Sequence, residues 1–386
     1  MNTLSPKLSS QLAAEAYTVT DQFKLDAFLQ RPEFLNSVGE AQSVRATVGG
    51  HYIKSRVGFG VCARGARQFN NDIFLVFRGS STGHCGLDWL SNVRVGIDSS
   101  ITGLPVHTGF NEIFYSLHAE LEFFIRQHRD ASTVHCIGHS SGGAVATLVA
   151  DWVQHFFGKK TIVYTFGAPK VGFESFAKSV TARLGGENIH RVYHSADPVP
   201  MLPLYPFLHT PSSTNGYQLA HQGAAVNHNS HLMLNYRKSL CRFERWQEVI
   251  CPLNICGDSE AIENWLCSDC VVSPYDPQTW SRISASLALV LKKIVKANAS
   301  LLQLPVIVGL TLADRIAWLL SEGVKKAFDI GVLIFYLMRK IMHAFGLSPM
   351  ASQEELSYEL MRNTLMRVMN KIGAEAKQAI ACMEHS

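Results

Sequence analysis

Short apolar runs alternate with longer amphipathic stretches between about residues 49 and 236. Residues 73–77 (Ile-Phe-Leu-Val-Phe) form a continuous apolar run, which is typical of a strand buried on both faces, and similar runs occupy 133–137, 161–166 and 189–193. Between these runs, residues 112–129, 141–157 and 173–184 carry apolar side chains at helical spacing. The pattern predicts an α/β fold in which a mostly parallel sheet is covered by helices.

The pattern changes on both sides of this region. We expect residues 1–246 to form one α/β domain that includes an N-terminal helical segment of about residues 1–48. Residues 247–280 read as a cysteine-rich connector, and residues 281–386 as an appended C-terminal α-helical region that is apolar and basic. Neither 301–320 nor 327–347 has the uninterrupted run of roughly 20 apolar residues that a membrane-spanning helix prefers. Helices with such broad apolar faces either pack in a bundle or lie on lipid.

Composition and charge exclude some classes of function. The chain of 386 residues is 47% apolar, which is typical of a globular protein, and its net charge of +4 predicts no nucleic-acid partner. The first 25 residues lack the basic start and apolar core of a secretory signal. We therefore expect synthesis in the cytoplasm, which leaves delivery by a dedicated secretion system open.

Four of the nine cysteines crowd together in the connector, at Cys251, Cys256, Cys267 and Cys270. Four thiolates satisfy a tetrahedral zinc ion, two disulfides suit a protein that leaves the cytoplasm, and free cysteines are the third alternative. The spacing does not choose among them, so we assign no metal and no cofactor.

The motif Gly138-His139-Ser140-Ser141-Gly142 stands between a predicted strand and a predicted helix. A nucleophilic serine requires this context, because a sharp turn exposes its hydroxyl and small neighbours let strand and helix approach closely. The helix that follows also directs backbone N–H groups toward a developing oxyanion. The alternative is a Gly/Ser-rich turn without chemistry, and His139 reads as structural.

A serine nucleophile needs a base, and the base needs an orienting carboxylate. Asp197 follows a predicted strand and so emerges at the carboxyl edge of the sheet; its alternative role is an Asx turn before Pro198. The residue pattern alone does not choose the base among the downstream histidines, which are His209, His221, His228 and His231.

From about residue 74 to residue 236 the chain resembles the class 3 lipases, which are serine hydrolases of the α/β-hydrolase fold. Seven motifs in consistent order carry this resemblance: Phe77-Arg78-Gly79-Ser80, Asp88-Trp89-Leu90, Val106-His107-Thr108-Gly109-Phe110, the Ser140 motif continued to Ala144, Thr165-Phe166-Gly167-Ala168-Pro169-Lys170-Val171-Gly172, Asp197-Pro198-Val199-Pro200 and His231-Leu232. Ser141 departs from the leucine that is common there in the family.

The resemblance implies a role for each site residue. Ser140 is the expected nucleophile, Asp197 the acid and His231 the base, with His228 as second choice. The backbone N–H groups of Ser80 and Ser141 are the expected oxyanion hole. The family also implies a lid between residues 82 and 104, whose apolar side chains include Leu87, Trp89, Leu90 and Val93. An ordinary packed surface loop is the alternative reading of that segment.

Taken together, these features predict a carboxylic ester hydrolase acting on phospholipid or acylglycerol, most like a phospholipase A or lipase at a membrane interface. Cations cluster beside the apolar faces of the C-terminal region, a combination that suits an anionic membrane surface; a bundle capping the hydrolase domain is the alternative. The rival functions are a membrane-perturbing or anchoring protein and a soluble esterase of small esters. A secreted bacterial effector would combine these features and would predict a neutralising (immunity) protein in the producing cell.

Overall fold

The structure is a computed structural model of the chain. It describes residues 3–19, 22–34, 41–49, 54–79, 96–212, 216–219, 226–249, 259–270, 272–273, 275–297 and 311–383.

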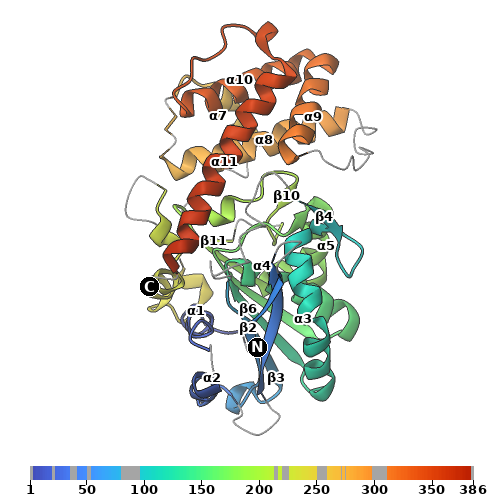
Figure 1. The fold of residues 1–386 in the computed structure, drawn as a ribbon, viewed down its shortest axis with the longest axis vertical. Helices are drawn as coiled ribbons and strands as arrows, with labels where there is room; N and C mark the ends of the chain where they lie inside the picture. The colour runs from blue at the N-terminus through green and yellow to red at the C-terminus, as the bar shows by residue number, and fades with distance from the viewer. Residues whose placement is uncertain are drawn as a thin grey trace.

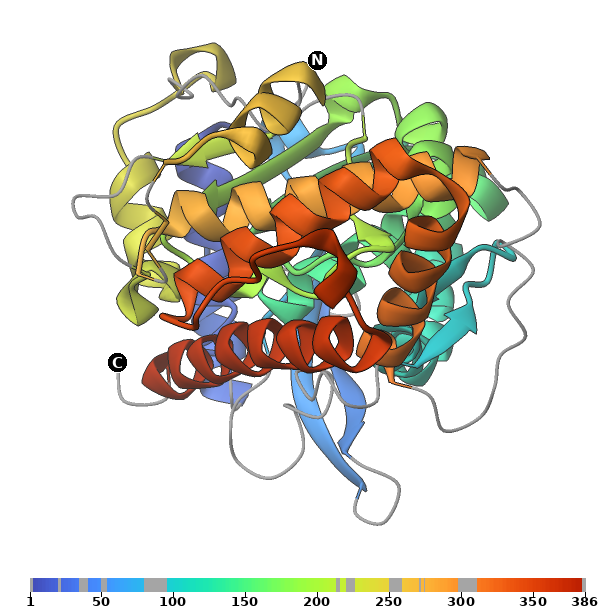
Figure 2. The same ribbon diagram turned by 90° about the horizontal axis from the view of Figure 1, so that it is seen from above.

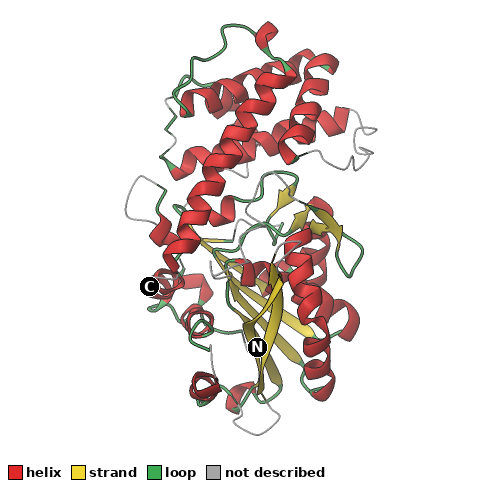
Figure 3. Cartoon of the chain, viewed as in Figure 1, coloured by secondary structure: helices red, strands yellow, loops and turns green. Residues whose placement is uncertain are grey.

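A seven-stranded sheet forms the centre of the α/β region (Figures 1 and 3). Its strands, in spatial order, are β1 (Ala41–Gly49), β2 (Lys54–Arg64), β3 (Asp72–Phe77), β6 (Thr133–His139), β7 (Lys160–Phe166), β9 (Ile189–His194) and β11 (Tyr217–Leu219). The strands from β3 to β11 are parallel, whereas β1 and β2 pair antiparallel at one edge. A second, four-stranded sheet contains β10 (Phe207–Leu208), β8 (Gly172–Phe173), β5 (Pro105–His107) and β4 (Ile97–Ser99).

Helices cover both faces of the central sheet, as the continuous apolar runs require. On β3, Ile73 and Leu75 belong to the same buried cluster as side chains of α3 (Thr108–Gln127), α4 (Ser141–Phe157) and α5 (Glu174–Leu184). Phe74 and Val76 point to the opposite face, where they join α1 (Pro6–Glu15), α2 (Gln22–Leu29) and α6 (Met233–Leu240). Each fully buried side chain of this size contributes about 1.5–3 kcal/mol of hydrophobic stabilisation. The predicted α/β class is therefore confirmed.

The expectation of a helical segment over residues 1–48 is wrong at its end. Helices α1 and α2 occupy the first part, but residues 41–49 form strand β1. The reason is a period of two in which Val44 and Ala46 are buried while Ser43, Arg45 and Thr47 are exposed, as one-sided packing of an antiparallel edge strand requires.

The C-terminal part of the chain forms a separate layer of helices, at one end of the α/β region (Figure 1). It consists of α7 (Ser259–Cys267), α8 (Pro277–Ala297), α9 (Leu312–Lys326), α10 (Phe328–Ala344) and α11 (Tyr358–Cys382). Because α7 and the first turn of α8 lie within 247–280, the helical region begins earlier than the sequence predicted. Among the described residues no helix has the length and apolarity needed to cross a bilayer.

The apolar stripes of these helices face one another. Leu287 of α8, Ile316 of α9, Ile334 of α10 and Leu365 of α11 are each at most 1% exposed and belong to one shared cluster. Of the two arrangements that the sequence left open for these stripes, the structure shows packing in a bundle.

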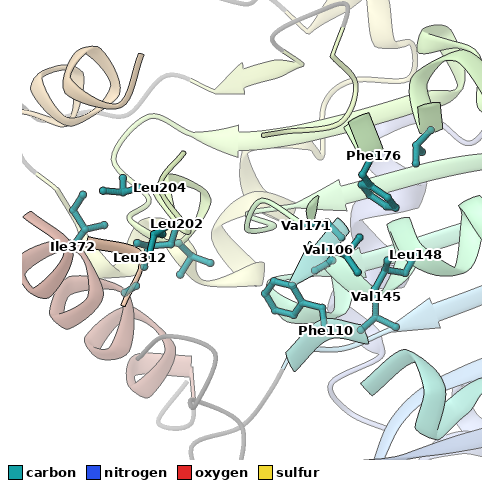
Figure 4. Packing of buried hydrophobic residues seen from close by; sticks show 14 of the residues in the cluster. Val106, Phe110, Val145, Leu148, Val171, Phe176, Leu202, Leu204, Leu312 and Ile372 are labelled. Atoms are coloured by element: carbon teal, nitrogen blue, oxygen red, sulfur yellow. The ribbon is translucent and has the colours of Figure 1, made fainter. Parts of the chain in front are cut away.

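The helical region covers the carboxyl edge of the central sheet, as the view from above shows (Figure 2). Helices α8 and α11 contact the 3-10 turn Val199–Met201, which lies in the loop after β9. Leu202 and Leu204 of this loop lie close to Leu312 of α9 and Ile372 of α11 (Figure 4), within the same buried cluster. The bundle thus packs onto the end of the sheet where parallel strands present their functional loops.

Candidate active site

Ser140 sits at a sharp corner between β6 and α4. Its backbone φ of 55° and ψ of −132° lie in a region that non-glycine residues rarely adopt. The strain persists because the corner is held on both sides: the Ser140 N–H donates to the Phe166 carbonyl of β7, and the Ser140 carbonyl accepts from Gly143. Such a turn projects the serine side chain above the carboxyl edge of the sheet.

The glycines of the motif are required by close backbone packing. A Cβ at Gly138 would collide with the backbone of Gly142, and a Cβ at Gly142 would collide with the carbonyl oxygens of Phe77 and Arg78. These contacts fix α4 against β3 and so fix the position of Ser140.

Ser140, His231 and Asp197 form a continuous hydrogen-bonded chain. The Ser140 Oγ lies 2.9 Å from Nε2 of His231, and Nδ1 of His231 lies 2.8 Å from Oδ2 of Asp197. With the proton on Nδ1, the imidazole donates to the carboxylate and accepts from the hydroxyl. These three residues lie in separate segments of the sequence, and the structure brings them together.

Asp197 is held by further donors. Its Oδ1 accepts from the backbone N–H of Val199 at 2.9 Å, and its Oδ2 accepts from the Tyr236 hydroxyl at 2.7 Å. Burial and the neighbouring Asp197 raise the pKa of Tyr236 well above its usual range, so the phenol stays protonated and keeps donating. The sequence did not indicate this role for Tyr236, because nothing local shows that its hydroxyl reaches Asp197.

His139 holds the backbone of His231, in agreement with the prediction that His139 has a structural role. Its Nε2 donates to the carbonyl oxygen of His231 at 2.7 Å, and its Nδ1 accepts from the Tyr17 hydroxyl at 2.6 Å. Burial lowers the pKa of His139 well below the usual histidine value, so the ring is neutral and can make one bond of each kind. Tyr17 also accepts from the N–H of Gly79, next to the predicted oxyanion loop. Sequence analysis missed Tyr17, which lies 122 residues before His139.

The remaining predicted site residues fall in different places. Ser141 begins α4 beside the nucleophile, so its backbone is at the N-terminal end of that helix. His228 lies one 3-10 turn before His231, and its Nε2 bonds to Glu375 of α11 at 2.5 Å instead of to Ser140. The other predicted oxyanion donor, Ser80, lies outside the described residues. So do the predicted lid residues Leu87, Trp89, Leu90 and Val93.

The three central side chains are almost completely excluded from solvent. Ser140 and Asp197 are each 1% exposed and His231 is 0% exposed. Hydrogen bonds and charges act more strongly in such a low-dielectric site than in water.

In the described part of the chain, no three His, Cys, Asp or Glu side chains are arranged so that they could hold a metal ion. Cys267 and Cys270 are exposed free thiols. Cys251 and Cys256, the other half of the cluster, lie outside the described residues.

Comparison with known proteins matches residues 74–207 to one family, lipase (class 3). A secreted mono- and diacylglycerol lipase of Fusarium solani is 33% identical over 174 residues, which are 43% of this chain and 50% of that protein. A chloroplastic phospholipase A(1) of Arabidopsis thaliana is 27% identical over 161 residues, which are 36% of this chain and 35% of that protein. The chain thus spans half or less of the length of these relatives.

Among solved structures, a triacylglyceride lipase of Rhizomucor miehei is similar, with a TM-score of 0.39 and 23% sequence identity, over 56% of this chain and 78% of that one. The family match spans β3, the Ser140 corner and the Asp197 loop. Together with the parallel sheet and its strand–corner–helix unit, it confirms the predicted α/β-hydrolase fold.

Proposed function

We propose that this protein is a serine hydrolase that cleaves carboxylic esters of lipids, with Ser140 as nucleophile, His231 as base and Asp197 as orienting acid. The observation that carries the proposal is the hydrogen-bonded chain from Ser140 Oγ through His231 to Asp197, at 2.9 and 2.8 Å. The class 3 lipase match over residues 74–207 supports the same chemistry.

In the proposed first half-reaction, Ser140 Oγ attacks the ester carbonyl while its proton passes to His231 Nε2. The carbonyl oxygen becomes an oxyanion, toward which the N-terminus of α4 directs its positive dipole end and the backbone N–H of Ser141. Asp197 stabilises the imidazolium that forms. His231 then gives its proton to the departing alcohol oxygen, the bond between acyl carbon and alcohol oxygen breaks, and the acyl group remains on Ser140.

In the second half-reaction a water molecule attacks the acyl carbon and gives a proton to His231. The bond to Ser140 Oγ breaks, the proton returns to that oxygen, and the fatty acid leaves. Two easier steps thus replace one difficult displacement.

Acylglycerols and phospholipids are the proposed substrate class. The names of the similar proteins include mono- and diacylglycerol lipases and a phospholipase A(1), which supports an acyl ester of a lipid as the substrate here. Attachment to a membrane surface, delivery as an effector and an immunity partner stay predictions from the sequence.

The test of the proposed function is fatty-acid release from mixed phospholipid and diacylglycerol, measured by mass spectrometry. We expect Ser140→Ala to lose activity by a factor on the order of 10⁴ or more. Ser175→Ala, which removes an exposed hydroxyl from α5, is the matched control and keeps full activity. Retention of hydrolysis by Ser140→Ala would refute the proposal.

The rival function, membrane perturbation by the helical region alone, predicts a different result in the same variants. If Ser140→Ala still released dye from phospholipid vesicles at the wild-type rate, the damage would not depend on hydrolysis. The inward packing of the stripes of α8, α9, α10 and α11 argues against this rival.

A further inference from the structure

A cavity of about 430 Å³ lies between the α/β region and helix α8. Its floor is formed by residues at the carboxyl ends of β7 and β9 and by the loop after β9, and α8 forms the facing wall. Asp197 belongs to the lining, so the cavity shares the Asp197 loop with the proposed catalytic site. Its size is within the range of small-molecule sites, which is about 300–1,000 Å³.

Cations dominate the lining of this cavity. It includes four Lys and Arg side chains and two carboxylates, namely Lys170, Lys178, Arg191, Lys292, Glu174 and Asp197. Both carboxylates are already engaged: Glu174 pairs with Lys178 and Lys292, and Asp197 is bonded to His231. The cavity therefore carries an excess of positive charge at neutral pH.

Lys170 is the central cation of the site. It is only 7% exposed, and its Nζ donates to the Met201 carbonyl oxygen at 3.1 Å and to Ser284 Oγ of α8 at 3.3 Å. In the described part of the chain no carboxylate lies within ion-pair distance of Lys170. A buried ammonium without a carboxylate partner is costly unless an anion approaches it.

Like charges surround Lys170. Burial and the nearby Arg191 lower the pKa of Lys170 to about 7. Burial, Arg191 and Lys170 lower the pKa of His209 well below its usual value. Arg191 itself is 6% exposed, and its guanidinium stacks over the Tyr193 ring at 4.2 Å. An anion placed among these groups would relieve their mutual repulsion.

The lining of the cavity also contains apolar side chains and serine hydroxyls. Helix α8 contributes Ala285, Ala288 and Leu289, and the floor contributes Phe207 and Leu208. Serine hydroxyls also line the cavity, at Ser195, Ser212, Ser259, Ser281 and Ser284. Cations with several hydroxyls suit the four oxygens of a phosphate, and the apolar wall suits a hydrocarbon attached to it.

We propose that this cavity binds the phosphate-bearing head group of a phospholipid, with Lys170 and Arg191 on the phosphate and α8 against the adjoining lipid chain. The proposal rests on the proposed lipid hydrolase function and narrows its substrate class from neutral acylglycerol to phospholipid. It also gives the helical region a part in substrate selection, since α8 completes the site.

The test measures binding in the Ser140→Ala background, where the probe is not consumed. The probes are dihexanoyl phosphatidylglycerol below its micelle concentration, dihexanoylglycerol and inorganic phosphate, each titrated by calorimetry. We expect the phospholipid to bind at least tenfold more tightly than dihexanoylglycerol or inorganic phosphate. We expect Lys170→Met to weaken the binding of the phospholipid at least tenfold. Lys7→Met removes an exposed lysine from α1 that pairs with Glu244 and is the matched control, which keeps the affinity.

Equal affinity for phospholipid and dihexanoylglycerol, or an unchanged affinity in Lys170→Met, would overturn the proposal. Inorganic phosphate that binds as tightly as the phospholipid would also overturn it, because the site would then serve free phosphate. These outcomes are independent of hydrolysis, so a failure of the proposed catalytic role would appear separately, as activity retained by Ser140→Ala.

A second variant keeps the test decisive if Lys170→Met does not fold. Ala288→Trp fills the cavity from α8 and leaves every cation in place. We expect it to lose at least tenfold in phospholipid affinity with an unchanged circular dichroism spectrum. Full affinity in a folded Ala288→Trp protein would place the lipid elsewhere and refute the assignment.

Discussion

The α/β region and the helical region both bury apolar side chains, but they differ in which atoms make the closest contacts. At the Ser140 corner, backbone lies against backbone: Gly142 faces the carbonyl oxygens of Phe77 and Arg78. In the helical region the close approaches are made by flexible side chains, as where Gly323 of α9 faces Ile294 of α8. Chemistry that depends on a few tenths of an ångström is placed in the first kind of packing, whereas the second kind tolerates adjustment.

The largest expected effect comes from the carboxylate of the triad. Asp197→Asn keeps the size of the side chain but removes the charge that orients His231, so the imidazole can hold the wrong tautomer. We expect kcat to fall by about 10⁴-fold with little change in the fold. Steady-state kinetics on a soluble ester, together with the melting temperature, measure both parts. A loss of less than tenfold would show that Asp197 does not act through His231.

A matched pair of glycine substitutions tests the difference between the two regions directly. Gly142→Ala forces a Cβ into two backbone carbonyls, and we expect it to lower the free energy of unfolding by about 3 kcal/mol. Gly323→Ala meets only the side chains of Ile294 and Ile330 and gains up to about 1 kcal/mol of helix propensity, so its net change stays within about 1 kcal/mol. Denaturant unfolding of both variants gives the comparison. Equal losses would contradict the distinction between backbone and side-chain packing.

Acid should weaken the α/β region before the helical region. His190 is 5% exposed, stacks on Trp246 at 4.2 Å, and has its pKa lowered to about 3 by burial. The unfolded chain therefore binds this proton near pH 6.5 while the folded chain does not, so stability falls as the pH drops from 6.5 toward 3. Among the described residues of the helical region, the histidine is His343, which is exposed.

The variant that checks this is His190→Phe. The unfolding free energy of the wild type falls between pH 7.5 and pH 5. We expect this fall to be about 2 kcal/mol smaller in His190→Phe. His343→Phe, which replaces an exposed histidine of the helical region, is the matched control. A pH dependence that stays the same in His190→Phe would show that this ring is not the group responsible.

The smallest expected effect is at an ion pair between the two regions, His228 with Glu375. The His228–Glu375 pair links α11 to the turn that carries His231, and both side chains are about one fifth exposed. Glu375→Gln should lower the unfolding free energy by about 0.5–1 kcal/mol, as for other partly exposed pairs. Lys377→Gln, an exposed substitution on the same helix, is the control. A loss above about 3 kcal/mol in thermal unfolding would mean that this contact carries the docking of α11.

The same contrast explains what the sequence could predict. The strands β3, β6, β7 and β9 are predictable because strands buried on both faces read as continuous apolar runs. Strand β1 was missed because a one-sided edge strand leaves only a weak alternation of apolar and polar residues. Strand β2 lies between β1 and β3 and was missed because Gly58 and Gly60 interrupt its apolar residues. The fold class followed from the long runs and is correct.

The site divides along similar lines. Ser140 and Asp197 stand in motifs whose local context indicates their roles, whereas the choice of His231 among four histidines came from the resemblance to the class 3 lipases. The structure places all three residues in one chain of hydrogen bonds. Tyr17 and Tyr236 carry no local signal, because their roles depend on contacts across 122 and 39 residues. Lys170 stands in a motif that the sequence shows, but its burial depends on α8, more than a hundred residues later.

The apolar faces of the C-terminal helices show the limit of pattern reasoning. An apolar stripe has the same sequence signature whether a neighbouring helix or lipid covers it. Only the three-dimensional arrangement assigns Ile316 and Ile334 to an interior between helices.

The most direct test of the account is covalent labelling of the nucleophile. A fluorophosphonate reacts with a serine only when a neighbouring base activates it, and intact mass with peptide mapping identifies the residue. The account predicts one label per chain, on Ser140, and labelling at least about 100-fold slower in His231→Ala although Ser140 is still present. A label on another residue, or an equal rate without His231, would contradict it.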